Sequence, residues 1–196
     1  MFPIRCAGLL VALFLSPAAQ AFYCFEPSPT YLQMGESYFT DTSSRIVVQG
    51  DEPALDIMEN LQGEWEGFLS EIICEGDKEA PEPIYREAEV EADVKDSNTA
   101  LFLISMSKTY RDSFVESESV YLMNKASMYS LRINDSFISA SERERRNLQG
   151  KQTGNRYVEV FSQIEIENDD QIVVDWQLFS NGVFVYSQRL TLDRDL

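Results

Sequence analysis

The feature that most constrains this chain is a series of segments in which apolar and polar residues alternate. In residues 84–94 the apolar side chains share one face of an extended chain, and four acidic side chains share the other. A period of two is typical of antiparallel strands with one buried face. Similar segments, alternating or rich in β-branched and aromatic residues, occupy residues 99–110, 114–125, 126–133, 157–167, 172–180 and 183–192. No long amphipathic helix follows Gly63, so the pattern predicts an all-β fold.

Short turns join these segments. Asn181-Gly182 lies between two alternating segments, and this dipeptide favours a tight hairpin because both residues adopt positive φ. Consecutive strands with tight connections form an up-and-down meander, which avoids exposed edges by closing on itself. We therefore expect an antiparallel up-and-down β-barrel of about eight to ten strands over residues 61–196. Asp51 and Pro53 are suited to begin a short helix over residues 51–60, directly before the first strand.

The first long strand is expected at residues 61–74. On it Gly63, Trp65 and Gly67 share one face, and the two glycines are the same-face neighbours of the tryptophan. Glycine weakens a strand interior, so this pair indicates close approach or sharp curvature, with room for the indole to lie on the backbone. Glu71 has the same parity as Trp65. It either lines a cavity or lies at the mouth of the barrel in solvent, and we expect the second.

The N-terminal residues 1–21 have the pattern of a secretory signal peptide. An apolar segment too short to span a bilayer ends in the small-x-small sequence Ala19-Gln20-Ala21. We expect cleavage after Ala21, no stable membrane anchor afterwards, and a periplasmic or secreted location. Residues 22–60 then form an N-terminal arm with an extended start, followed by the short helix.

Two cysteines remain after removal of the signal peptide, Cys24 and Cys74. An even number of cysteines in an exported protein favours an intramolecular disulfide. This bond would tie the N-terminal arm to the far end of the first strand. The alternative is a pair of unpaired buried thiols.

Charge and composition exclude several functions. The formal net charge is −17 and the chain has no histidine. Phosphate backbones and anionic membranes would repel such a surface, so we expect no nucleic-acid binding. The lack of histidine excludes His-ligated zinc, a Ser-His-Asp triad and a Cys-His pair. We therefore predict no catalytic residues, no metal site and no cofactor, and the sequence leaves any cofactor-binding residues unknown.

Two charged segments have alternative interpretations. Residues 142–147, ERERRN, contain Arg143, Arg145 and Arg146, which either hold an anion or lie in a solvated loop beside their own glutamates. We expect the solvated loop. Asp169-Asp170 is either a calcium ligand pair or a polar hairpin tip, and we expect the hairpin tip.

Residues 61–67, LQGEWEG, resemble the G-x-W signature that opens the first strand in lipocalins and related calycin barrels. The matching positions are Gly63, Trp65 and Gly67, which are structural in that family. The resemblance implies a short helix before the motif and an arginine that packs over the tryptophan at the closed end. Either Arg189 or Arg194 is in the right region of the last strand. A nitrobindin-like haem site is not carried over, because that branch builds it on histidine.

These observations leave three classes of function. The leading expectation is an exported, non-enzymatic binding protein that holds a small hydrophobic or amphipathic ligand in the barrel. The first alternative is an interaction protein with a side-chain-filled barrel, whose outer surface meets a protein partner. Leu101 and Leu103, opposite the Phe102 face, would then form an apolar outer strip, unless the N-terminal arm covers them. The second alternative is an enzyme that acts through carboxylates.

Overall fold

The computed structural model describes residues 23–40, 48–49, 57, 59–134, 136–148 and 154–194. Within these residues the chain is nearly all β-structure, as the alternation predicts. The signal-peptide segment lies outside them. The elements are α1 (Pro29–Met34), the 3-10 helix η1 (Gly35–Phe39), β1 (Val48–Gln49), β2 (Gly63–Gly76), β3 (Pro81–Lys95), β4 (Ala100–Tyr110), β5 (Val115–Asn124), β6 (Met128–Asn134), β7 (Phe137–Leu148), β8 (Gly154–Asn168), β9 (Gln171–Ser180) and β10 (Val183–Arg194).

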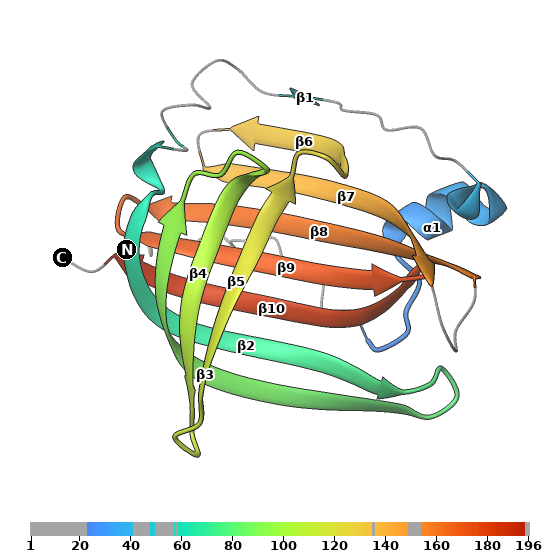
Figure 1. Cartoon of the computed structure of the whole chain (residues 1–196), viewed down its shortest axis with the longest axis horizontal. Helices are drawn as coiled ribbons and strands as arrows, with labels where there is room; N and C mark the ends of the chain where they lie inside the picture. Colours follow the sequence, from blue (N-terminus) through green and yellow to red (C-terminus); the bar gives the residue numbers. More distant parts are fainter. Residues whose placement is uncertain are drawn as a thin grey trace, which may run out of the picture.

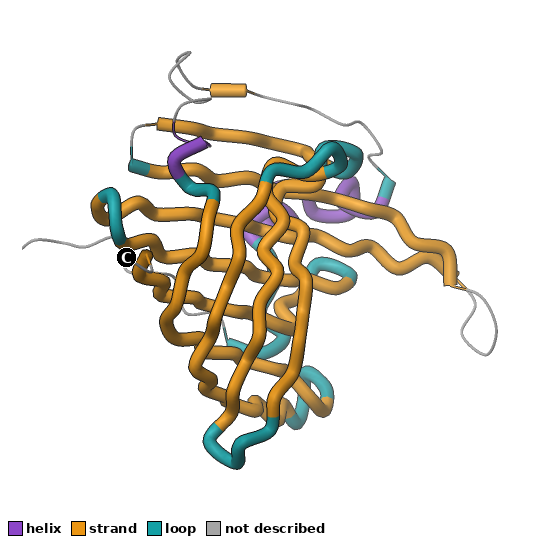
Figure 2. Tube along the Cα trace, turned by 60° about the vertical axis from the view of Figure 1, so that its left-hand side comes forward, coloured by secondary structure: helices purple, strands orange, loops and turns teal. Residues whose placement is uncertain are grey.

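The strands form one sheet in the order β1-β6-β7-β8-β9-β10-β2-β3-β4-β5. All neighbours from β6 to β5 are antiparallel, and the two-residue strand β1 adds to β6 in parallel. The sheet curls until β3, β4 and β5 cross in front of β7–β10 (Figures 1 and 2). The predicted antiparallel up-and-down architecture is confirmed, in the form of a curled half-barrel.

The two ends of the curl meet through a turn and not through a ladder. Among the described residues no ladder joins β5 to β6. Instead, the Arg143 N–H on β7 donates to the Ser127 carbonyl in the β5–β6 turn at 2.9 Å. The Ser127 hydroxyl donates in return to Glu142 at 3.0 Å. These contacts hold the β5–β6 turn against β7, and among the described residues β5 forms a ladder with β4 alone.

The hydrophobic core fills one half of the curl. Trp65 and Leu69 on β2 pack there with the inward residues of the neighbouring strands, and all are buried. The inward faces are those that the alternation predicts, because one pleat face of each strand is apolar. The largest inward core residues besides Trp65 are Phe102, Ile104, Leu122, Ile138, Ile164 and Ile172.

The N-terminal arm contains a helix that was not predicted from sequence. Residues 22–50 show no clear period, yet Ser28 caps α1 by accepting from the Tyr31 N–H at 3.0 Å, and Pro29 occupies the first helical position. Both residues are standard signals for a helix start, and the helix was missed because it has only six residues. Of the helix expected at residues 51–60, only Ile57, Glu59 and Asn60 are described, and these are helical.

A disulfide between Cys24 and Cys74 attaches the arm to the end of β2, as predicted. Pro27 forms a bridge to Val183 on β10, and Tyr38 packs on β8. Residues 23–40 of the arm therefore lie on the outer face of the sheet, beside the ends of β7 and β8 (Figure 1). Leu101 and Leu103 on β4 are half-buried, and the part of the arm at residues 23–40 packs elsewhere.

Residues 142–147 are not the solvated loop that we expected. They lie within β7, which pairs with β8 from Phe137 to Leu148. The alternation of glutamate and arginine hides a strand here, because one face carries Glu142 and Glu144 and the other carries Arg143 and Arg145. No helix of the described residues is long and apolar enough to cross a membrane.

Candidate ligand-binding site

The predicted structural residues lie at the filled end of the half-barrel. Trp65 is buried and its indole N–H donates to the Leu61 carbonyl at 3.1 Å. The Arg194 guanidinium lies over the indole, 4.5 Å from the ring centroid, in a cation–π contact. Arg189 instead faces outward and pairs with Asp175 at 3.1 Å. Of the two candidate arginines, Arg194 is therefore the one that covers Trp65.

The two glycines fit the expected close approach better than the expected seat for the indole. A Cβ on Gly67 would lie 2.0 Å from the Thr191 carbonyl oxygen on β10, so the glycine permits close approach of two backbones. Gly63 has φ +128°, and its Cβ would lie 3.8 Å from the Arg194 guanidinium. Neither site leaves room primarily for the indole. The glycines allow the sheet to curve and Arg194 to approach.

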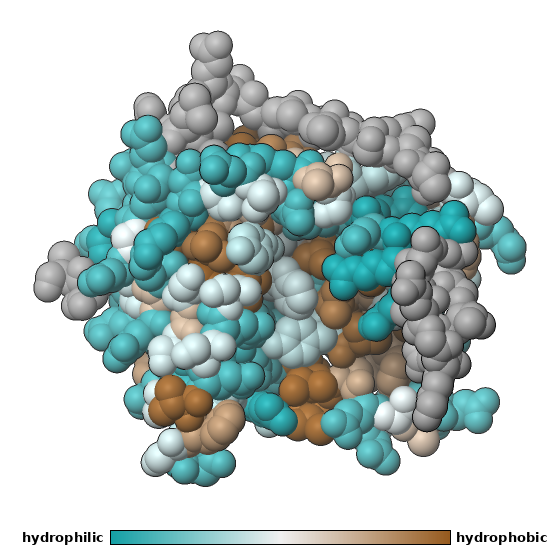
Figure 3. All heavy atoms as spheres, viewed as in Figure 1, coloured by the Kyte–Doolittle hydropathy of each residue, from teal (hydrophilic) through white to brown (hydrophobic). Residues whose placement is uncertain are grey.

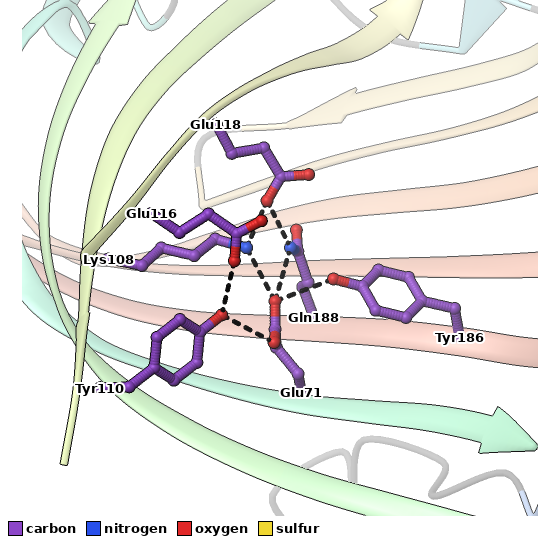
Figure 4. A network of polar contacts seen from close by, with 7 residues as sticks. All are labelled: Glu71, Lys108, Tyr110, Glu116, Glu118, Tyr186 and Gln188. Atoms are coloured by element: carbon purple, nitrogen blue, oxygen red, sulfur yellow. Dashed lines mark hydrogen bonds and ion pairs between the residues drawn. The ribbon is translucent and has the colours of Figure 1, made fainter. Parts of the chain in front are cut away.

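A polar network lies on the concave face, beside the hydrophobic core (Figure 4). Its centre is Glu71 on β2, which is 4% exposed. Glu71 Oε1 accepts hydrogen bonds from Lys108 Nζ at 2.7 Å, from the Tyr186 hydroxyl at 2.9 Å and from Gln188 Nε2 at 3.0 Å. Glu71 Oε2 accepts from the Tyr110 hydroxyl at 3.2 Å. We expected Glu71 to lie at the mouth of the barrel in solvent, and this prediction is wrong. Its strand position faces the interior, beside these donors.

The network holds Glu71 and Lys108 in their charged forms. Burial alone would raise the pKa of Glu71, but the hydrogen bonds from Lys108, Gln188 and Tyr186 hold it below the usual value. Burial likewise disfavours the charged form of Lys108, but its contacts with Glu118 and Glu71 raise the pKa. Burial and the Glu71 charge raise the pKa of Tyr186, which therefore stays protonated and donates.

The network carries an excess of negative charge. Lys108 forms a second ion pair with Glu118, and Gln188 also donates to Glu118 at 3.1 Å. The Tyr110 hydroxyl is 3.4 Å from Glu116 Oε2. Three carboxylates, Glu71, Glu116 and Glu118, thus lie around one ammonium group (Figure 4). No group of the described residues has the three or more ligands that would mark a metal site.

The concave face beyond the network is apolar and only partly covered. Trp176 on β9 is the register neighbour of Gln188, and its ring meets Tyr186 edge-on with centroids 5.5 Å apart. Val160 and Leu178 lie in the next row and are half-buried. In contrast, Ile164 and Val174, farther along β8 and β9, are 1% exposed. Figure 3 shows the corresponding face hollowed at its centre, with brown and pale residues at the back of the hollow.

Two polar groups on the same face are buried without a full set of partners. Ser162 lies beside Trp176 in the β8–β9 register and is 1% exposed. Its hydroxyl has no hydrogen-bond partner among the described residues, and neither has Glu142 Oε1 on β7. Burial raises the pKa of Glu142 despite hydrogen bonds from the Asn124 and Met123 backbones and from the Ser127 side chain. Buried polar groups normally have partners, so the Ser162 hydroxyl is an exception on this face.

A second buried carboxylate lies on the outer face, under the arm. Glu159 on β8 is fully buried and accepts from the Tyr38 hydroxyl at 3.3 Å, while its Oε1 has no partner among the described residues. Arg143 stacks on the Tyr38 ring at 4.5 Å and donates to the Tyr38 carbonyl. Burial raises the pKa of Glu159, and this effect outweighs the opposing influence of the Ser28 and Thr30 side chains and of Arg143. Glu159 contributes to the attachment of the arm and not to the concave face.

The sequence contained part of the signal for this site. Lys108 and Tyr110 continue the parity of Phe102, Ile104 and Met106, which marks a lysine on an inward face. Gln188 and Tyr186 likewise share the parity of Leu190. Their convergence on Glu71 was missed because it depends on the pairing of β2 with β10 and on the curl that brings β4 across.

No protein-family model matches this chain, and no curated protein matches its sequence. Among solved structures, the S-type phycobiliprotein lyase CPES from Guillardia theta is similar to it, with a TM-score of 0.41 and 11% sequence identity. The match covers 72% of this chain and 92% of that chain. These values are too low to assign a family, so the site is interpreted from its own residues.

Proposed function

We propose that the protein is an exported, non-enzymatic binding protein that holds one small amphipathic molecule on the concave face. The apolar part of the ligand lies against Trp176, Leu178 and Val160, and its polar part meets the network around Glu71. The calycin resemblance at Gly63 and Trp65 is part of the same proposal, although these positions are structural and carry no ligand identity.

One observation carries the proposal. On β8 and β9 the inward residues Ile164 and Val174 are 1% exposed, whereas Val160, Trp176 and Leu178 on the same faces of the same strands remain half-buried. Leaving apolar surface in water is unfavourable by about 25 cal/mol per Å². Partly covered inward residues beside a fixed polar network are typical of a binding site.

The first experiment measures binding of a neutral apolar fluorophore, N-phenyl-1-naphthylamine, to the purified protein. We expect one site per chain and about tenfold weaker binding by Leu178→Asn, because a buried leucine contributes about 1.5–3 kcal/mol. Phe68→Ala is the matched control, since Phe68 is 65% exposed on the outer face. Unchanged affinity in Leu178→Asn, or a loss in Phe68→Ala, would place the probe on the outer surface and reject the proposal.

Export and the lack of enzymatic activity need separate tests. Residues 1–21 have the signal-peptide pattern, and the Cys24–Cys74 disulfide suits an oxidising compartment. Mass spectrometry of the protein from its own host should give an N-terminus at Phe22. Native mass spectrometry of the same sample should retain one unmodified small molecule. A protein partner at fixed stoichiometry with no small molecule would favour the interaction-protein alternative.

A further inference from the structure

We propose that the ligand of the concave site is an amphipathic amine, whose protonated nitrogen is bound by Glu116 and Glu118. This inference rests on the proposed ligand-binding function and adds the chemical class of the ligand. It follows from the charge of the network, from the aromatic pair beside it and from the buried polar groups that have no partner.

The network already binds one ammonium group, that of Lys108. This side chain is 3% exposed and lies between Glu71 and Glu118, with Gln188 bridging the same two carboxylates. Its position shows that the inward face can hold a protonated nitrogen between carboxylates. Lys108 balances only one of the three negative charges.

The remaining negative charge lies on β5 and is accessible. Glu116 and Glu118 are two residues apart on one strand, so their side chains leave the same face about 7 Å apart at Cα. Glu116 is exposed and the Glu118 side chain is 37% exposed. Arg86 on β3, the register partner of Glu71, is exposed and has no part in the network. A ligand ammonium there would therefore meet Glu118, which shares Lys108 with Glu71, and Glu116, which forms no ion pair with Lys108.

The aromatic wall suits the same ligand. Trp176 and Tyr186 border the network, because Tyr186 donates to Glu71 and Trp176 pairs in register with Gln188. Aromatic faces attract cations and accept apolar groups, so they can hold both the carbon atoms next to a charged nitrogen and the apolar body.

An independent observation comes from Ser162. It is 1% exposed, faces the concave side next to Trp176, and its hydroxyl has no hydrogen-bond partner among the described residues. Glu142 Oε1, one strand farther on the same face, is also without a partner. Because the Ser162 hydroxyl lies next to Trp176, it suits a second polar group on the body of the ligand, away from the nitrogen held by Glu116 and Glu118.

The test compares three probes of equal chain length: dodecylammonium, dodecanol and dodecanoate. Each competes with bound N-phenyl-1-naphthylamine, so only binding at the concave site is counted. We expect dodecylammonium to displace the fluorophore at about tenfold lower concentration than dodecanol, because ion pairs and a cation–π contact each contribute modestly. Dodecanoate should be the weakest of the three.

Variants locate the charge effect. In Glu116→Gln/Glu118→Gln the amine preference should fall to within about twofold, whereas Glu89→Gln/Glu91→Gln, with two exposed outer-face carboxylates removed, should retain it. If the first double variant does not fold, Glu116→Gln alone changes only an exposed residue and should lower the preference about threefold.

Several results would overturn the inference. Equal binding of amine and alcohol by the unaltered protein rejects the amine class but leaves the proposed function intact. A preference that persists in Glu116→Gln/Glu118→Gln, or one that is lost in Glu89→Gln/Glu91→Gln, assigns the effect to overall charge. No binding of the neutral fluorophore rejects the proposed function as well.

Discussion

Two buried glutamates on opposite faces of the same sheet have pKa values shifted in opposite directions. Glu71 on the concave face accepts four hydrogen bonds, one of them from Lys108, and its pKa is lowered. Glu159 under the N-terminal arm accepts from Tyr38, and its pKa is raised because burial outweighs the opposing hydrogen bonds from Thr30, Ser28 and Tyr38. Burial alone therefore does not decide the charge of a carboxyl group, because hydrogen bonds and a neighbouring cation oppose it, and only around Glu71 do they outweigh it.

The two regions are also held together in different ways. Around Glu71 the donors come from β4 and β10, whose backbones are fixed by ladders. Around Glu159 the covering residues belong to α1 and η1, which are short and are attached through the Cys24–Cys74 disulfide. We infer that the concave network is preorganised and that the arm depends on its covalent link.

The largest expected effect is in the concave network. Lys108→Met retains the methylene stem but leaves Glu71 buried without its cation, which should lower the free energy of unfolding by about 3–5 kcal/mol. Urea denaturation measures this change. Arg111→Met is the control, because Arg111 and Glu87 form an exposed ion pair that should contribute at most about 1 kcal/mol. A loss below about 1 kcal/mol in Lys108→Met would mean that the network is not a unit.

The second effect concerns the arm. Cys24→Ser/Cys74→Ser removes a link that closes a loop of sequence separation 50, for which the chain-entropy model predicts about 4 kcal/mol. We expect a correspondingly lower free energy of unfolding in urea, with fluorophore binding at the concave face retained. Thiol titration of the denatured, unreduced protein should find neither cysteine free. Two reactive thiols, or unchanged stability of the variant, would contradict the prediction.

The direct comparison uses two isosteric changes at neutral pH. Glu71→Gln removes an ionised acceptor from four donors and should cost about 2 kcal/mol. Glu159→Gln replaces a buried carboxyl group whose raised pKa favours the neutral form, so it should alter the free energy of unfolding by less than about 1 kcal/mol, or raise it. Equal destabilisation by the two changes would show that the difference in hydrogen bonding has no energetic consequence.

The smallest effect is a difference in pH dependence, with opposite signs. The lowered pKa of Glu71 stabilises the fold above the pKa of the unfolded chain, about 4.3, and this stability is lost as the pH falls through the lower folded value. The raised pKa of Glu159 destabilises the fold above its folded value, so acidification from that value toward about 4.3 restores stability.

Measurements of unfolding from pH 7 to pH 3 for the unaltered protein and each variant separate these effects. Relative to Glu159→Gln, the unaltered protein should gain stability as the pH falls toward 4.3. Relative to Glu71→Gln, it should lose stability below about 4.3. The same sign for both differences would contradict the assignment of charge states in the two regions.

The strand positions followed from sequence because they depend on local periodicity. The alternation in residues 84–94 lies within β3, and Asn181-Gly182 forms the expected turn between β9 and β10. In the N-terminal arm, helix α1 was not predicted, because it is too short to show a period. The prediction for residues 142–147 was wrong because both faces of this strand segment carry charged residues, which leaves no apolar alternation.

By itself, the sequence determined the fold class, the inward face of most strands and the disulfide between Cys24 and Cys74. These depend on parity, turn chemistry and cysteine number. Only the tertiary structure decided that Arg194 rather than Arg189 covers Trp65, and that Glu71 is buried. The hydrogen-bond partners of Glu71 lie 37, 39, 115 and 117 residues away in the chain, and register and sheet curvature bring them together. Local patterns carry no information on such pairings, because one pleat face offers many equivalent neighbours until the sheet is assembled.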